Sequence, residues 1–383
     1  MGIQGLAGFV IGVMVGTPVS ALALNQTEII QTHIHRLGRD YARVYQQEAA
    51  SALVQIGPAA VPFLIQALST PDTPRRIHVI EVLGDLKDPK AMDFLLREFE
   101  NTSSKEIQCK IVEALGKLRA PLLYDFFASR VEDPDAGLRC FAIWSLGELR
   151  LQKAVPLLLE VLRTEDGYPL ITAIDALGKT GLPEQSTLLL EYLKYENIQT
   201  RFVTAKALGE IGDARVVPAL LHAMVKEPDP EVQEALAQTL GKIGGDAALS
   251  KLVQLIKEKS SPTLQHLAET GLESAGLQAA FYLMPFLKGD DFRLRLSAAK
   301  ILGAIRAPGA IPYLVQMAEE KNPTARVVAI TALGGCGDIS VMALLTHMAR
   351  SDEMVIREAA AEAMKKIAAR NEQLYQETRK RSG

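Results

Sequence analysis

Residues 201–213 read RFVTAKALGEIGD, and residues 326–338 read RVVAITALGGCGD. Both stretches contain Ala-Leu-Gly and then Gly-Asp, with two residues between them. Apolar or small side chains recur in each of them at intervals of three and four residues, the spacing of one face of an α-helix. The motif therefore predicts a helix of about 14 residues that buries one face.

The Leu of this motif returns at a nearly constant interval along the chain. It lies at Leu53, Leu83, Leu115, Leu146, Leu177, Leu208, Leu240, Leu272, Leu302 and Leu333, with Met364 in the last copy. We number every repeat from this residue as position zero. Such uniform spacing predicts an all-α fold, an α-α superhelix: a solenoid of about eleven helical hairpins of ~31 residues each.

Position +1 is Gly in most copies, as in Gly147 and Gly303. Gly inside a helix is unfavourable by about 1 kcal/mol relative to Ala, so its recurrence predicts close backbone approach. Position +4 is Gly or a cation, which predicts the end of this first helix. A second apolar run with an early Pro follows, as in residues 155–162, and predicts a second helix.

The two quoted stretches resemble HEAT repeats, specifically the short version named after phycobilisome bilin lyases, an armadillo-like helical solenoid. The resemblance covers about residues 38–370. It implies a right-handed superhelix whose second helices line the concave face. It says little about function, because repeats of this kind serve unrelated roles.

The amino terminus differs from the rest of the chain. An uncharged apolar stretch, Leu6 to Gly16, precedes Ala21-Leu22-Ala23, the layout of a secretory signal peptide. The alternatives are an uncleaved membrane tether through residues 1–24 and a misassigned start codon on a cytoplasmic protein. We therefore divide the chain into a signal peptide or anchor (1–23), an N-terminal capping segment (24–37), the solenoid (38–370) and a polar C-terminal tail (371–383).

Composition argues against several functions. The net charge is −3, without a concentrated basic stripe, so nucleic acid is not an expected partner. Three cysteines do not form a disulfide framework, and we expect Cys109 and Cys140 to be small, partly buried apolar residues. The six histidines lack metal-ligand spacing. We predict no catalytic residue, cofactor or metal.

Position −7 is Arg in six repeats: Arg76, Arg139, Arg201, Arg295, Arg326 and Arg357. The row has two interpretations, an anion-binding track and an internal ladder in which each Arg pairs with a carboxylate of a turn or link. We favour the internal ladder, which repeats of this family commonly show.

A partner is expected along the second helices. Position +14 samples their exposed face, and the candidate partner surface is Arg97, Ser129, Glu160, Glu191, His222, Gln254, Phe286 and His347. The middle of the row is acidic, which suits a protein with a modest basic patch. The chain is poor in aromatic residues, so Tyr124, Phe127, Tyr192, Tyr195 and Tyr282 are candidate anchors.

These observations predict a scaffold for protein binding rather than an enzyme. We expect the chain to be exported, periplasmic or extracellular, or membrane-tethered, and to bind another protein along its concave face. The alternative is a bilin-lyase-like enzyme or chaperone that handles a chromophore in the cytoplasm, and its support is the repeat subtype.

Overall fold

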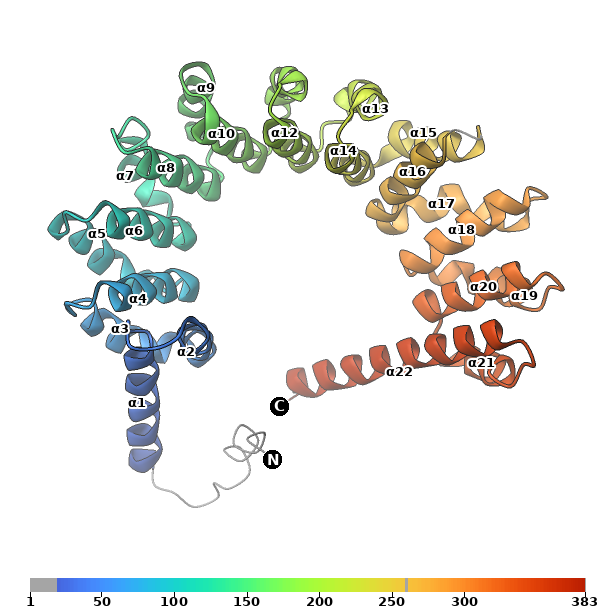
Figure 1. The fold of residues 1–383 in the computed structure, drawn as a ribbon, viewed down its shortest axis with the longest axis horizontal. Coiled ribbons are helices and arrows are strands. Elements are labelled where there is room, and N and C mark those ends of the chain that lie inside the picture. Colours follow the sequence, from blue (N-terminus) through green and yellow to red (C-terminus); the bar gives the residue numbers. More distant parts are fainter. Residues whose placement is uncertain (1–18, 259–260, 383) are drawn as a thin grey trace. The chain divides into compact units, whose positions relative to one another are not determined.

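The computed structural model describes residues 19–258 and 261–382, and every regular element within them is a helix (Figure 1). The chain forms two compact units, residues 1–176 and 177–383, with the boundary inside helix α10. The predicted signal or anchor falls outside the described residues up to position 18. Helix α1 (Val19–Arg36) then crosses the expected boundary between residues 23 and 24.

Eleven first helices begin the repeats, which confirms the predicted period. They are α2 (Arg43–Ile56), α4 (Thr73–Leu86), α6 (Lys105–Leu118), α8 (Ala136–Leu149), α10 (Gly167–Thr180), α12 (Ile198–Ile211), α14 (Pro230–Ile243), α16 (Pro262–Ser274), α18 (Phe292–Ala304), α20 (Pro323–Cys336) and α22 (Met354–Ser382). The Leu at position zero is fully buried in the first ten of them.

A short 3-10 turn leads from most first helices into a shorter second helix. The turns are η1 (Gly57–Ala60), η2 (Pro89–Ala91), η3 (Pro121–Leu123), η4 (Gln152–Ala154), η5 (Pro183–Gln185), η7 (Ala214–Val216), η8 (Gly276–Ala279), η10 (Pro308–Ala310) and η11 (Ile339–Val341). The second helices are α3 (Val61–Ala67), α5 (Met92–Asn101), α7 (Tyr124–Ala128), α9 (Val155–Thr164), α11 (Ser186–Leu189), α13 (Val217–Lys226), α15 (Gly245–Lys257), α17 (Ala280–Leu283), α19 (Ile311–Ala318) and α21 (Met342–Met348).

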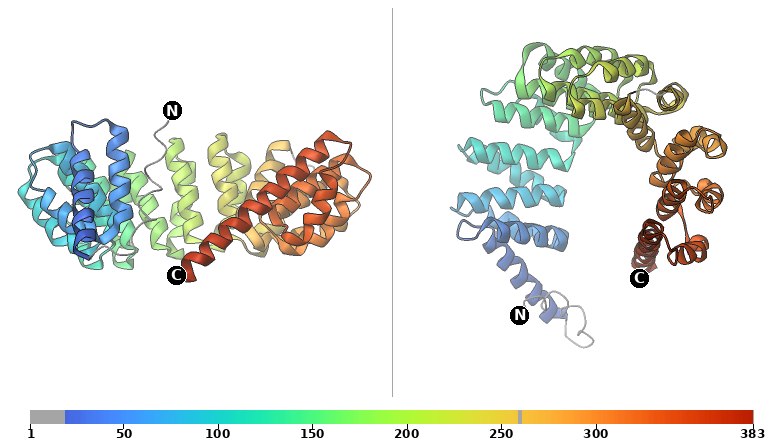
Figure 2. Two further views of the ribbon diagram at one scale, coloured as in Figure 1. Left: turned by 90° about the horizontal axis from the view of Figure 1, so that it is seen from below. Right: turned by 45° about the vertical axis from the view of Figure 1, so that its right-hand side comes forward.

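The last repeat departs from the expected hairpin. Helix α22 has no second helix after it within the described residues, and it continues to Ser382 instead of ending before a separate tail at residue 371 (Figure 2). Near the start of the expected tail, the Arg370 guanidinium donates to the carbonyl oxygens of Gly335 and Gly337 at the end of α20. The array thus ends in a single long helix.

Neighbouring first helices pack closely, as the recurrent Gly predicts. A Cβ atom on Gly147 would lie 2.7 Å from the Cα of Ala176, and one on Gly303 would lie 2.5 Å from the Cα of Ala332. In each unit taken by itself, Figure 1 draws the first helices on the inside of the curve of the stack. The expectation that second helices line the concave face is therefore wrong. The physical reason is that Gly lets neighbouring first helices approach more closely, which bends the stack toward their side.

The first helices end where the sequence predicts. Lys87, Arg119, Arg150 and Arg306 at position +4 are left-handed, with φ between 52° and 57°. Gly57, Gly181, Gly212, Gly244 and Gly276 also have positive φ at the same position, between 59° and 78°. The ψ angles of Gly57 and Gly244, −148° and −149°, differ from those of a left-handed helical residue. A residue in the left-handed region stops the helix and turns the chain back toward its second helix. Gly337 is the exception, with φ of −69°.

Candidate functional site

The Arg row at position −7 forms the internal ladder. Each guanidinium reaches from the start of a first helix to a carboxylate or carbonyl at the end of a second helix. The ion pairs are Arg76–Glu98, Arg139–Glu165, Arg201–Glu227, Arg295–Glu320 and Arg326–Glu353, and Arg357 donates to the carbonyl oxygens of Ser351 and Asp352. Since these guanidinium groups are already occupied, the row is not an anion-binding track.

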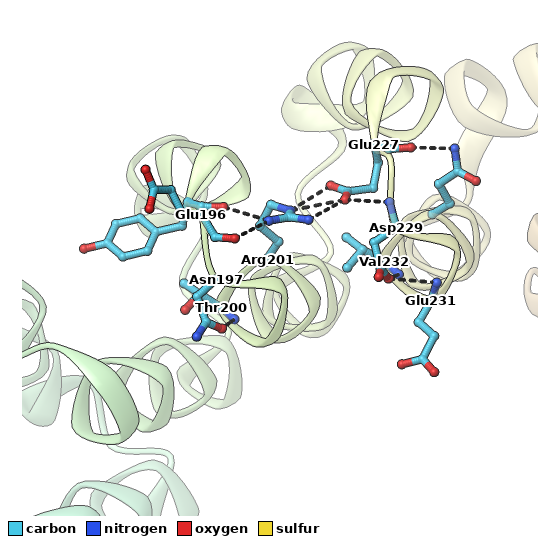
Figure 3. Close-up of polar contacts among 10 residues, drawn as sticks. Glu196, Asn197, Thr200, Arg201, Glu227, Asp229, Glu231 and Val232 are labelled. Atoms are coloured by element: carbon cyan, nitrogen blue, oxygen red, sulfur yellow. Dashed lines mark hydrogen bonds and ion pairs between the residues drawn. The ribbon is translucent and has the colours of Figure 1, made fainter.

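Arg201 is the most enclosed member of the ladder. Its Nε and Nη2 donate to the Glu227 carboxylate at 2.7–3.2 Å, and its Nη1 donates to the carbonyl oxygens of Tyr195 and Glu196 at 2.9 Å (Figure 3). Arg201 is 9 % exposed and Glu227 8 % exposed. Hydrogen bonding to Glu227 raises the pKa of Arg201. The guanidinium thereby ties together two successive second-helix ends.

The predicted partner row lies on the second-helix layer. Arg97, Ser129, Glu160, Glu191, His222, Gln254 and His347 are exposed, whereas Phe286 is half-buried. The two acidic residues of the row are neutralised within their own helices or turns. Glu160 pairs with Arg163 at 3.3 Å, and Glu191 pairs with Lys194 at 2.8 Å. The acidic character that suggested a basic partner is thus cancelled locally.

The five aromatic candidates divide into different environments. Phe127 is fully buried, so its assignment as an anchor is wrong. It occupies position +12, where other repeats bury Leu158 or Leu189 against the first helix. Tyr124 donates to the Lys153 carbonyl at 3.1 Å, and Tyr282 donates to Asp246 at 3.0 Å, so both hydroxyl groups already have acceptors.

Tyr192 and Tyr195 stand apart from the other candidates because their rings stack, with centroids 5.6 Å apart and an interplanar angle of 28°. Tyr195 is 44 % exposed. It lies beside Glu191 and His222, two members of the partner row, in one groove. The structure therefore brings three predicted site residues together.

This groove lies between η6 (Leu190–Lys194) and α13, and its volume is about 620 Å³. Its apolar lining is Leu190, Leu193, Ala219, Ala223 and Pro228. Lys194, Lys226 and the Arg201–Glu227 pair supply most of its charged lining. This size falls within the range of about 300–1,000 Å³ that is typical of ligand-binding clefts. We call it the η6–α13 groove.

His347 lines a register-equivalent groove of about 390 Å³ in a later repeat, together with Glu320, Arg326, Leu344 and Met348. Position +14 thus faces the space between successive second helices. The sequence did not predict these grooves, because the residues that shape them lie at positions +11 and +15. Two further aromatic residues are strongly exposed and were not among the candidate anchors: Tyr168 is 80 % exposed and Phe281 is 81 % exposed.

The cysteines are free, and Cys109 and Cys140 are half-buried, as predicted. Burial raises the pKa of the Cys109 and Cys336 thiols to about 11. No group of three or more His, Cys, Asp or Glu side chains among the described residues is placed to hold a metal ion.

One described stretch, residues 43–67, is long and apolar enough to cross a membrane by length and composition. It consists of α2, η1 and α3, the hairpin of the first repeat, and Gly57 with φ of 78° separates its two helices. Leu53 and Leu64 bury the facing sides of these two helices. A repeat hairpin accounts for this stretch.

Comparisons with known proteins agree with the repeat architecture. The family profile for HEAT repeats matches residues 30–116, 94–178, 124–200, 186–273 and 282–365. The chain is 29 % identical over 129 residues to the bilin biosynthesis protein PecE of Mastigocladus laminosus, a match over 33 % of this chain and 48 % of that protein. The match thus spans about half the length of this relative.

Similar solved structures include the complex of CpcE and CpcF of phycocyanin lyase from Nostoc sp. PCC7120, with 23 % identity and a TM-score of 0.35 over 64 % of this chain and 94 % of that chain. Yeast importin-beta is also similar, with 14 % identity and a TM-score of 0.46 over 92 % of this chain and 59 % of that chain. The family matches together cover far more than half of the sequence. This protein belongs to the HEAT-repeat family.

Proposed function

We propose that this chain is a non-catalytic scaffold that binds another protein through its second-helix layer. The observation that carries the proposal is the row at position +14, which is exposed in successive repeats and borders grooves between second helices. In a repeat array each hairpin contacts its neighbours, so within each unit one register position becomes an extended surface. Such a surface suits a partner that is itself extended.

Site-specific photo-crosslinking tests the proposed surface. A photoreactive amino acid is placed at Ser129, His222 or Gln254 in the full chain, with Lys206 and Thr331 on exposed first-helix positions as matched controls. After irradiation in the native host, we expect one partner protein to be joined from the second-helix positions and not from the controls. Crosslinks from the controls alone would contradict the proposed surface, and the lack of any crosslink would contradict the scaffold function.

We also propose that the protein is exported or membrane-tethered, on the strength of the uncharged apolar stretch and the small residues at Ala21 and Ala23. The same purification identifies the mature amino terminus by mass spectrometry. A start at Leu24 supports a cleaved signal peptide, and an intact Met1 in the membrane fraction supports a tether. An intact Met1 in the cytosolic fraction contradicts both.

A second candidate function is the handling of a bilin chromophore, and the similarity to a bilin biosynthesis protein favours it. The test is to purify the full chain from cells that make a linear tetrapyrrole and to record its visible spectrum. A stoichiometric visible band supports this function. A colourless protein that still crosslinks to its partner leaves the scaffold as the function.

A further inference from the structure

We propose that the η6–α13 groove is the docking site for a peptide segment of a partner protein, in which a bulky apolar side chain enters the groove and a neighbouring acidic residue pairs with Lys226. The proposal rests on the proposed scaffold function and specifies the chemistry of what that scaffold binds.

The η6–α13 groove is larger than the register-equivalent groove of about 390 Å³ at Leu344 and Met348, because its repeat lacks two bulky side chains. Position +11 carries a large apolar residue in other repeats: Phe94, Phe126, Leu157, Leu188, Tyr313 and Leu344. Position +15 is similarly occupied by Val161, Leu255, Leu287, Met317 and Met348. In α13 these two positions are Ala219 and Ala223, four residues apart on one helix face, and both line the groove. The missing volume is therefore concentrated at one place on the surface.

The opposite wall of the groove comes from a short second helix and the 3-10 turn that follows it. Helix α11 has 4 residues and passes into the 3-10 turn η6, whereas α9 and α13 have 10 residues each. Leu190 and Leu193 in this turn are half-buried, and the Tyr195 ring follows at its end. Apolar atoms thus face one another across the groove, and a bulky apolar side chain would remove them from water.

The polar groups at the floor already have partners. The Arg201 guanidinium and the Glu227 carboxylate bond to each other, and the remaining Arg201 donors bond to backbone carbonyl oxygens. A ligand does not need to satisfy these groups, so the floor does not select for a deeply buried charge. Apolar contact and shape therefore determine which side chain of the partner peptide can enter the groove.

The charge at the rim of the groove determines which residues of the partner peptide can flank its apolar side chain. Glu191 is neutralised by Lys194 and Glu227 by Arg201. Lys226 is exposed at the rim and has no ion-pair partner among the described residues. The rim therefore presents one unopposed positive charge, which favours an acidic flank. This reverses the basic partner that the acidic residues of the +14 row had suggested.

The test restores in α13 the side chains of the other repeats. The double variant Ala219→Leu, Ala223→Met narrows the groove with the residues that these register positions hold at Leu344 and Met348, so we expect the fold to be kept. Short fluorescein-labelled peptides serve as probes: a Leu-Phe pair flanked by glutamates, the same pair flanked by lysines, and an Ala-Ala pair flanked by glutamates. Affinity is measured by fluorescence anisotropy on the full chain.

We expect the acidic Leu-Phe peptide to bind at least about tenfold more tightly than either of the other peptides. The double variant should lose this binding. Lys226→Gln should lower the affinity for the acidic Leu-Phe peptide and leave the affinity for the basic Leu-Phe peptide unchanged. The control is Ala128→Leu, which adds the volume of one of the two substitutions at a half-buried alanine on α7 and should bind like the wild type. Circular dichroism and melting temperature report whether each variant is folded.

Three results would overturn the proposal: no peptide binding to the wild type, unchanged binding in a folded double variant, or equal affinity for the acidic and basic peptides. These results are distinguishable from failure of the scaffold function. If the photo-crosslinks from Ser129 and Gln254 persist while the groove binds no peptide, the protein is a scaffold whose partner docks elsewhere.

Discussion

Arg201 and Glu227 connect the start of a first helix to the end of the second helix in the same repeat, with Nη2 2.7 Å from a carboxylate oxygen. Because this pair is buried, removal of the cation leaves Glu227 without its counter-ion. The carbonyl oxygens of Tyr195 and Glu196 also lose their donor. We predict that Arg201→Met lowers the free energy of unfolding by about 3–5 kcal/mol.

The matched control for this prediction is Arg163→Met. The Arg163 side chain is 72 % exposed and pairs with Glu160 on the surface, so its loss should cost no more than about 1 kcal/mol. Guanidinium denaturation gives the global effect, and hydrogen exchange of α12 and α13 gives the local one, because repeat arrays unfold in parts. Equal effects of the two substitutions would show that the ladder carries no special stability.

The recurrence of Leu at one spacing was enough to predict the helical hairpins, because one buried position per repeat forces the same packing each time. The partner site was harder to predict. Position +14 predicts which side chains are exposed, whereas the size of the η6–α13 groove depends on the small side chains of Ala219 and Ala223. Phe127 is not an anchor, because its register position decides its burial: Leu158, at the same position +12, is also fully buried.

The Gly at position +1 indicates which helix layer lies on the inner side of the stack. This Gly predicts close approach of neighbouring first helices, whereas the family resemblance implies that the second helices line the concave face. Closer spacing on one layer bends a stack toward that layer. Gly147 and Gly303 therefore favour the arrangement that the structure shows, with the first helices on the inside of the curve in each unit.

We predict that Gly303→Ala destabilises the fold, although Ala is the better helix former by about 1 kcal/mol. The new methyl group would lie 2.5 Å from the Cα of Ala332, and backbone atoms cannot rotate away as a side chain does. The expected loss is about 1–3 kcal/mol, measured by chemical denaturation. Gly309→Ala is the control, because its nearest neighbour would be the Met284 Cε atom at 3.6 Å. A stabilised Gly303→Ala variant would argue that the first helices can separate freely.

The thiols should be unreactive in the folded protein. Burial raises the pKa of Cys109 and of Cys336 to about 11, and nearby Asp135 adds to the effect at Cys109. Since the thiolate is the reacting species, a pKa two units above the usual value slows reaction at pH 8 by roughly a hundredfold. We expect slow release of thionitrobenzoate from Ellman's reagent until guanidinium exposes all 3 cysteines. Ser129→Cys, at an exposed position, is the positive control and should react at once.

Acid should weaken the turns that Asp residues hold at position +5. Hydrogen bonds from the Arg215 side chain, followed by one from its backbone N–H, keep the pKa of Asp213 below its usual value. Such a carboxylate stabilises the fold above its unfolded pKa of about 4, and this stability is lost as the pH falls through the lower folded pKa.

Asp213→Asn should therefore lower the free energy of unfolding by about 1 kcal/mol near pH 7, and this loss should shrink on acidification. Urea denaturation at several pH values measures it, with Asp125→Asn on an exposed face of α7 as the control. A cost that stays constant down to about pH 3 would mean that Asp213 acts through the shape of its side chain and not through its charge.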